Sequence, residues 1–222
     1  MCGRYDLNEN PAVIQLCFEL GILPALRPRY NIAPGQSAPV VRLAEDGGRA
    51  LAMLRWGLIP FWAKDEKIGY RTINARAETV ATAPAFRAGF KRRRCIVPAS
   101  GFFEWKTLVH GKQPYRIKPA DTPLFGFAGL WEVWRSPGGE PVESFSIITT
   151  EANELLRTLH TRMPAILAPG EYGKWLTADA ADAAAMLRPC CAAHMLAYPV
   201  SKKVNNARVD EPDCIEPAAE AA

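Results

Sequence analysis

A succession of short, strand-like segments joined by tight turns constrains the fold of this chain more than any other feature. Segments 38–44 and 50–56 flank Glu45-Asp46-Gly47-Gly48 and are predicted to form a hairpin. The later segments share a richness in apolar and β-branched residues and lie at 94–97, 101–107, 114–118, 124–133, 142–150 and 195–200. Turns are expected at His110-Gly111-Lys112 and Ser136-Pro137-Gly138-Gly139. Because short connections join antiparallel neighbours, we expect mostly antiparallel sheet.

Helices are expected at fewer places along the chain. Asn10 and Pro11 open a first helix that runs to about Leu20 and ends at Gly21. Other helical segments are predicted at 77–83, 152–159, 171–176 and 180–187. The pattern predicts an α+β fold, a mostly antiparallel and partly barrel-like sheet with packed helices, in a single domain over 1–210. The Pro, Glu and Ala of 211–222 predict a disordered tail.

Composition excludes several classes of protein. Of the 222 residues 49% are apolar, yet no run approaches the roughly 20 apolar residues of a membrane span. The N-terminal residues lack the basic-then-apolar pattern of a secretory signal, so we expect a cytoplasmic protein with no membrane partner. The six cysteines follow no disulfide framework, and the histidines (His110, His160, His194) do not pair at zinc-ligand spacing, so no metal or cofactor is expected. A net charge of +4 permits a nucleic-acid partner without establishing one.

Cys2 directly follows the initiator methionine. Removal of Met1 would leave an amine and a thiol on adjacent carbons, with ordinary pKa values of about 8 and about 8.5. Such a pair forms a Schiff base with an aldehyde and then closes a five-membered thiazolidine ring, a step that proximity favours. Taken alone, however, Cys2 is also explained as a small residue that happens to follow Met1.

Sequence blocks in one order along the chain carry a family resemblance. They read Met1-Cys2-Gly3-Arg4-Tyr5, Tyr30-Asn31-Ile32-Ala33-Pro34, Trp56-Gly57-Leu58-Ile59-Pro60-Phe61-Trp62-Ala63, Asn74-Ala75-Arg76-Ala77-Glu78-Thr79, Arg94-Cys95-Ile96-Val97-Pro98-Ala99, Gly101-Phe102-Phe103-Glu104-Trp105, Ala128-Gly129-Leu130-Trp131-Glu132, Thr149-Thr150-Glu151-Ala152-Asn153, His160-Thr161-Arg162-Met163-Pro164 and Val200-Ser201-Lys202-Lys203-Val204-Asn205-Asn206. From Cys2 to about Asn206 the chain resembles the SOS-response-associated peptidase (SRAP) family, the abasic-site processing proteins.

The resemblance implies a function and a set of site residues. Members of this family crosslink covalently to abasic sites in single-stranded DNA through a thiazolidine and shield the lesion from strand cleavage. The nucleophile matches Cys2, and the active-site asparagine, glutamate and histidine match Asn74, Glu104 and His160. Thr161 stands where many relatives carry Asp. The resemblance also implies a monomer in the bacterial cytoplasm, associated with the nucleoid and the replication fork.

The same side chains have chemical uses of their own. Glu104 is a candidate general acid/base for opening the closed sugar, and partial burial on its strand would raise its pKa. Asn74 is suited to hold the new N-terminus or the sugar, and His160 to transfer a proton near pH 7. Each has a plain alternative: a solvated strand glutamate, a turn-forming asparagine, and a histidine at a helix C-terminus.

DNA binding requires cations and aromatic faces. Arg4, Arg76 and Arg162 lie within two residues of proposed catalytic residues and would clamp phosphates, while Trp62 would stack on a base. Ordinary salt bridges and core packing are the alternatives. We expect the basic run 91–94 to be a solvated surface that attracts DNA non-specifically.

Three other functions remain open. Met-Cys-Gly also begins class II glutamine amidotransferases, but the Asn-Gly-Glu-Ile-Tyr-Asn-like and Arg-Gly-Pro-Asp-like segments of that class are missing. An N-terminal Cys with His160 could instead cleave amides in other proteins, as the word peptidase suggests. A binding module for single strands without a covalent step would need no reactive Cys2.

Overall fold

A closed barrel forms the centre of the computed structural model, which describes residues 2–136 and 138–219. The strands are β1 Tyr5–Leu7, β2 Arg29–Ile32, β3 Ser37–Leu43, β4 Arg49–Trp56, β5 Asn74–Arg76, β6 Arg94–Ala99, β7 Gly101–Leu108, β8 Gly111–Pro119, β9 Phe125–Arg135, β10 Pro141–Glu151, β11 Arg162–Pro164, β12 Ile166–Leu167 and β13 Met195–Pro199. Strands pair in the order β10-β4-β3-β6-β9, and β9 pairs again with β10. This last pairing closes a five-stranded barrel, which leaves these strands no free edge along the paired positions.

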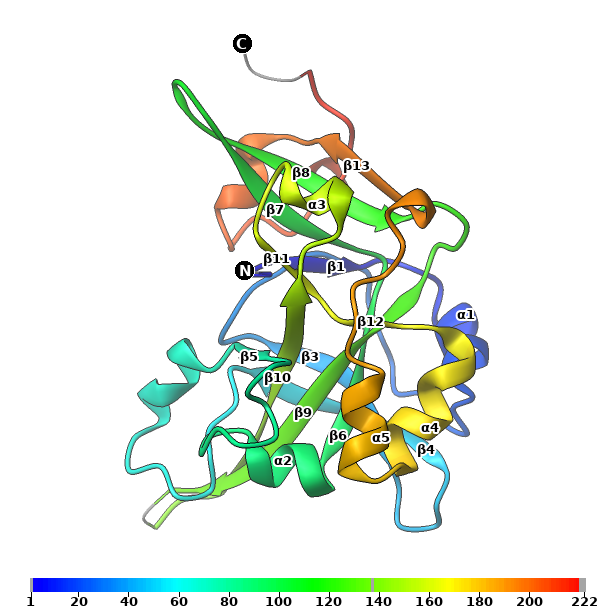
Figure 1. The fold of residues 1–222 in the computed structure, drawn as a ribbon, viewed down its shortest axis with the longest axis vertical. Coiled ribbons are helices and arrows are strands. Elements are labelled where there is room, and N and C mark those ends of the chain that lie inside the picture. Colours follow the sequence, from blue (N-terminus) through cyan, green and yellow to red (C-terminus); the bar gives the residue numbers. More distant parts are fainter. Residues whose placement is uncertain (1, 137, 220–222) are drawn as a thin grey trace.

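A smaller second sheet lies above the barrel in Figure 1, in the order β13-β8-β7-β1-β2. Short helices cover the rest: α1 Pro11–Phe18, α2 Arg87–Arg92, α3 Glu154–Arg157, α4 Tyr172–Thr177 and α5 Ala180–Ala185, with 3-10 turns η1 Glu66–Arg71, η2 Pro169–Glu171, η3 Ala192–His194, η4 Lys202–Asn205 and η5 Pro212–Cys214. Within the described residues, no helix has the length and apolarity needed to cross a bilayer.

Aromatic side chains fill the barrel. Tyr5 from the second sheet packs edge-on against Trp56 and Phe127, with ring centroids 5.2 and 6.0 Å apart. Gly126 in β9 leaves room for the neighbouring Ile96 side chain, because a Cβ there would lie 2.3 Å from Ile96 Cγ2. All four of these larger side chains are fully buried, so the barrel is a packed apolar core with the strand β1 laid against it.

Strand β1 joins the two sheets. The backbone of Arg4 accepts a hydrogen bond from Phe103 N, and that of Asp6 accepts one from Ser100 N. The buried Asp6 carboxylate also pairs with Arg116 of β8 at 2.8 Å. The N-terminal residues are therefore fixed in the seam between barrel and second sheet, where the chain begins in Figure 1.

The α+β class and its mostly antiparallel sheet are confirmed, although β10 runs parallel to β4 and β5. The helix expected at 77–83 is wrong. That segment forms successive turns in which Thr79 O accepts from Thr82 N and Ala83 N, and Pro84 follows at once. A proline disfavours the helical backbone of the residue before it, which stops the turn from extending.

The expected disorder of the tail is also wrong for residues 211–219. Pro212–Cys214 form η5, Cys214 is fully buried, and Pro217 bridges to Val200. The prediction rested on the Pro, Glu and Ala content of this segment. It took no account of the apolar side chains of Cys214 and Ile215, which pack against the second sheet. The last three residues of the predicted tail, 220–222, lie outside the described residues.

Candidate active site

Cys2 lies in the seam, immediately before β1, with no exposed surface. Its carbonyl oxygen accepts a hydrogen bond from Asn74 Nδ2 at 2.8 Å. Burial raises the pKa of the Cys2 thiol, and the nearby carboxylate of Glu104 raises that pKa further. The thiol is therefore protonated at neutral pH, and its contact with Arg4 O at 3.8 Å makes it a weak donor.

Asn74 reaches Cys2 from the barrel side of the seam. It begins β5, which pairs in parallel with β10 so that Asn74 lies opposite Ile147. The Asn74 Oδ1 atom is buried and has no hydrogen-bond partner among the described residues. A buried amide oxygen without a partner costs free energy, so this atom is an acceptor available to an N–H group beside Cys2.

Glu104 faces the same seam from the second sheet. It lies in β7 opposite Tyr115 of β8, and only 3% of its surface is exposed. Burial raises the pKa of this carboxyl, while the ammonium of Lys112 acts in the opposite direction. A carboxyl with a raised pKa can hold a proton closer to neutral pH, which suits general acid/base work.

His160 completes the group from the loop that follows α3. Its Nδ1 accepts a hydrogen bond from Arg162 N at 2.9 Å. When Nδ1 accepts this shorter bond, rather than donating to Arg162 O at 3.3 Å, the proton of the neutral ring is on Nε2. Burial lowers the pKa of His160 and so favours this neutral form. His160 and Glu104 line one cleft of about 440 Å³.

The structure brings the four predicted residues together from four distant segments, before β1, at β5, in β7 and after α3. Three further residues line the cleft: Trp105, Lys112 and Asn205. Trp105 Nε1 donates to Asn205 Oδ1 at 2.7 Å, which fixes one wall. Sequence reasoning treated Lys112 only as part of a turn. The pairing of Lys112 with Thr107 across the β7–β8 hairpin is what carries it to the cleft.

The four residues proposed to contact DNA differ in solvent exposure and in the partners they already have. Arg76 is exposed, and Trp62 is 48% exposed rather than part of the core. Arg4 is half-buried and donates to Gly3 O and Asn205 O. Arg162 is paired with Glu78, at 2.9 Å from Nη2 to Oε2, and also donates to Thr149 O. Arg162 would have to exchange a partner to hold a phosphate.

The basic run 91–94 is not uniformly solvated. Lys91 and Arg92 are exposed, but Arg94 is buried and donates to Trp175 O at 2.6 Å and Phe90 O at 2.7 Å. The expectation of a solvated surface is therefore wrong for Arg94. The Arg94 guanidinium donates to carbonyl oxygens that helix ends leave unpaired. A run of basic residues in the sequence does not reveal such partners.

The chain is similar to known proteins over nearly its whole length. A family model described as SOS response associated peptidase (SRAP) matches residues 1–207. The abasic site processing protein YoqW of Bacillus subtilis is 44% identical over 97% of this chain and 99% of its own. The abasic site processing protein HMCES of Gallus gallus is 35% identical over 86% of this chain and 66% of its own. A solved structure from Bacteroides thetaiotaomicron superposes with a TM-score of 0.90 at 30% identity, covering 98% of this chain and all of its own.

Proposed function

The chain belongs to the SOS response associated peptidase family, and we propose that it processes abasic sites in single-stranded DNA by forming a covalent thiazolidine through Cys2. One observation carries this proposal: a buried cysteine, an amide, a carboxyl and an imidazole lie together beside one cleft. The names of the relatives, abasic site processing proteins, support the same lesion.

The first step proposed is Schiff-base formation. Removal of Met1 exposes the α-amine of Cys2, which adds to the aldehyde carbon of the opened abasic sugar to give a carbinolamine. Glu104, with its raised pKa, gives a proton to the departing hydroxyl, so that water leaves and a protonated imine remains. Asn74 Oδ1 accepts a hydrogen bond from the amine and orients it while Nδ2 holds the carbonyl.

The second step proposed is ring closure. The Cys2 sulfur adds to the imine carbon, forming the S–C bond, and the thiol proton passes to Glu104, whose carboxylate was freed in the first step. The electron pair of the C=N bond returns to nitrogen. The product is a thiazolidine, and one water is lost overall. The thiol does not need to ionise beforehand, which suits a sulfur whose pKa is raised by burial.

His160 supports the opening of the sugar ring. With Nδ1 accepting from Arg162 N, the neutral ring carries its proton on Nε2 in this proposal. Donation from Nε2 to the ring oxygen would release the aldehyde. Burial keeps the ring neutral, so it donates as imidazole rather than competing as a second cation beside the imine.

The DNA strand is held on either side of the lesion in this proposal. Arg4 and Arg76 contact flanking phosphates, Arg162 does so by exchanging Glu78, and Trp62 stacks on a neighbouring base. A monomer suffices for this, acting in the cytoplasm on single strands exposed at replication forks. Where the imine persists, strand cleavage by β-elimination competes with closure, and Met1 is removed by an aminopeptidase or by the chain itself.

Mass spectrometry of the intact protein tests the proposal. Met1-free protein mixed with a single-stranded oligonucleotide bearing one abasic site should gain the mass of one oligonucleotide less one water. Cys2→Ser keeps the amine but closes a weaker ring, so it should give a hydride-trappable complex and little stable adduct. An undamaged oligonucleotide is the matched control. No adduct from verified Met1-free protein, or an equally stable one from Cys2→Ser, would contradict the thiazolidine.

A further inference from the structure

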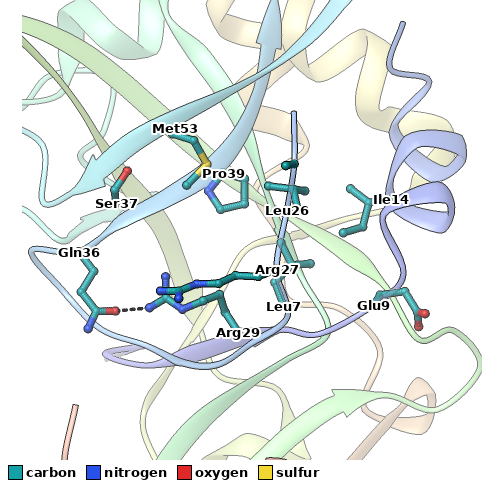
Figure 2. A pocket seen from close by; sticks show the side chains of 11 residues that line it. Leu7, Glu9, Ile14, Leu26, Arg27, Arg29, Gln36, Ser37, Pro39 and Met53 are labelled. Carbon is teal, nitrogen blue, oxygen red and sulfur yellow. Dashed lines mark hydrogen bonds between the residues drawn. The ribbon is translucent and has the colours of Figure 1, made fainter. Parts of the chain in front are cut away.

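A hollow of about 720 Å³ lies away from the active-site cleft, between the segment 25–29, helix α1 and the β3–β4 hairpin (Figure 2). None of its described lining residues lines the cleft that holds Glu104. Leu7 in its wall is five residues along extended chain from Cys2, about 17 Å. Its volume is typical of sites for small molecules.

One end of this hollow is positively charged. Arg27 and Arg29 are two residues apart, with Pro28 between them. Figure 2 shows both running toward Gln36. Arg29 is held by Asp210 and by Gln36 Oε1, the latter at 2.7 Å, which fixes its guanidinium in place.

The charge at this end is not balanced. Asp210 neutralises Arg29, whereas Arg27 has no hydrogen bond or ion pair among the described residues. The Glu9 carboxylate lies at the far end of the view and turns away, and it accepts from Asn10 N. One uncompensated guanidinium beside a second, oriented one is an arrangement that favours an anion with several oxygens, such as a phosphate.

The other side of the hollow is apolar. Leu7, Ile14 and Pro39 form part of it and are buried, and Met53 lies opposite Pro39 in the β3–β4 pairing. Met53 is 49% exposed although it lies within strand β4. Its exposed thioether, beside the Pro39 ring that lines the wall, offers a polarisable contact for a planar group. A ligand that fits both ends of the hollow would carry an anionic group and a planar apolar group, and a nucleotide has both.

We propose that this hollow binds one nucleotide, with its phosphate on Arg27 and Arg29 and its base against Pro39 and Met53. The site neither includes Cys2 nor needs an aldehyde, so it goes beyond the proposed crosslinking. The same chemistry is offered by a free mononucleotide and by an undamaged nucleotide within single-stranded DNA.

Calorimetric titration of the full chain with thymidine 5′-monophosphate tests the site. We expect saturable binding that Arg27→Gln weakens about tenfold through the loss of a charge-assisted contact. Arg135→Gln is the matched control, because Arg135 is an exposed cation at the end of β9 outside the hollow, and it should leave binding unchanged. Thermal unfolding checks that each variant is folded.

Two further titrations identify the ligand. Met53→Ala should weaken the mononucleotide but not inorganic phosphate, and phosphate should bind at least about tenfold more weakly than the mononucleotide. A short undamaged oligothymidylate separates the sources: weaker binding by Arg27→Gln assigns the site to DNA, and unchanged binding assigns it to the free nucleotide. Mononucleotide binding that is insensitive to Arg27→Gln, or no tighter than that of phosphate, overturns the proposal. Neither probe carries an aldehyde, so these outcomes are independent of Cys2.

Discussion

The barrel interior and the seam beside it are buried to the same degree, yet they bury opposite kinds of group. In the barrel, Trp56 and Phe127 are fully enclosed by other apolar side chains. In the seam, Cys2 and Glu104 are as inaccessible, although burying an ionisable group opposes folding. The packed apolar core and the buried ionisable groups are thus separated within a single domain.

The largest effect that would test this separation is expected in the seam. Glu104→Gln replaces a buried carboxyl with a neutral group of the same shape. Crosslinking to abasic single-stranded DNA should slow by about 10²- to 10⁴-fold, the usual contribution of general acid/base catalysis. Stability should not fall, because the group removed is one whose ionisation burial disfavours. Single-turnover gel assays and urea unfolding measure the two.

Glu132→Gln is the matched control for that variant. Glu132 is also 2% exposed, but it lies in barrel strand β9 and pairs with Arg93 at 2.7 Å. Its loss should lower stability and leave the crosslinking rate of folded protein unchanged. Equal slowing by both variants would mean that the seam has no special part in the chemistry.

A cavity in the barrel should lower stability without slowing crosslinking, which is the opposite of what is expected for Glu104→Gln. Phe127→Ala removes a fully buried ring that contacts Phe125 and Phe102 edge-on. The free energy of unfolding should fall by about 3–5 kcal/mol. At low temperature, where the variant remains folded, its crosslinking rate should match the wild type. A rate loss without loss of stability would show that the barrel shapes the site directly.

The pH dependence of stability is a smaller and more specific effect. Burial raises the pKa of Glu104, so the folded state holds this proton more tightly than the unfolded chain does. The contribution of Glu104 to stability is therefore present below its unfolded pKa of about 4.5 and is lost as pH rises through the folded value. Urea unfolding across this range should show wild type losing stability relative to Glu104→Gln as pH rises. A constant difference would contradict the raised pKa.

The smallest effect is expected at the rim of the seam. Lys112 is exposed and lines the cleft, so its ammonium is placed to contact a phosphate near the lesion. Lys112→Gln should weaken non-covalent binding of single-stranded DNA a few-fold and reduce its salt slope by about 1. Lys67→Gln, at an exposed site on η1, is the control. Identical salt slopes for both variants would exclude the phosphate contact.

Much of the barrel could be predicted from the sequence because strand alternation and turn residues are local signals. The hairpin at 38–56 and the strands over 94–151 follow from them. The three-residue strands β1, β5 and β11 do not, since pairing with distant strands is what makes them extended. The parallel contact of β4 with β10 is equally non-local.

The residues of the candidate site also fall into those that the sequence could identify and those that it could not. Cys2, Asn74, Glu104 and His160 could be named from family blocks, each of which is local in sequence. Asn205 could not be connected with them, because η4 enters the cleft only through packing of the C-terminal segment on the second sheet. Local sequence patterns identify the candidate residues. The pairing registers between strands determine which of these residues lie close together.

The complete burial of Cys2 sets an order of events during synthesis. The N-terminus leaves the ribosome first, whereas Glu104, His160 and Asn205, which line the cleft, emerge later. At about 5–20 residues per second, roughly 10 to 40 s separate Cys2 from Asn205. If an aminopeptidase carries out the proposed removal of Met1, this interval is when the first peptide bond is reachable, and translation speed then determines how much of the protein gains a free Cys2 amine.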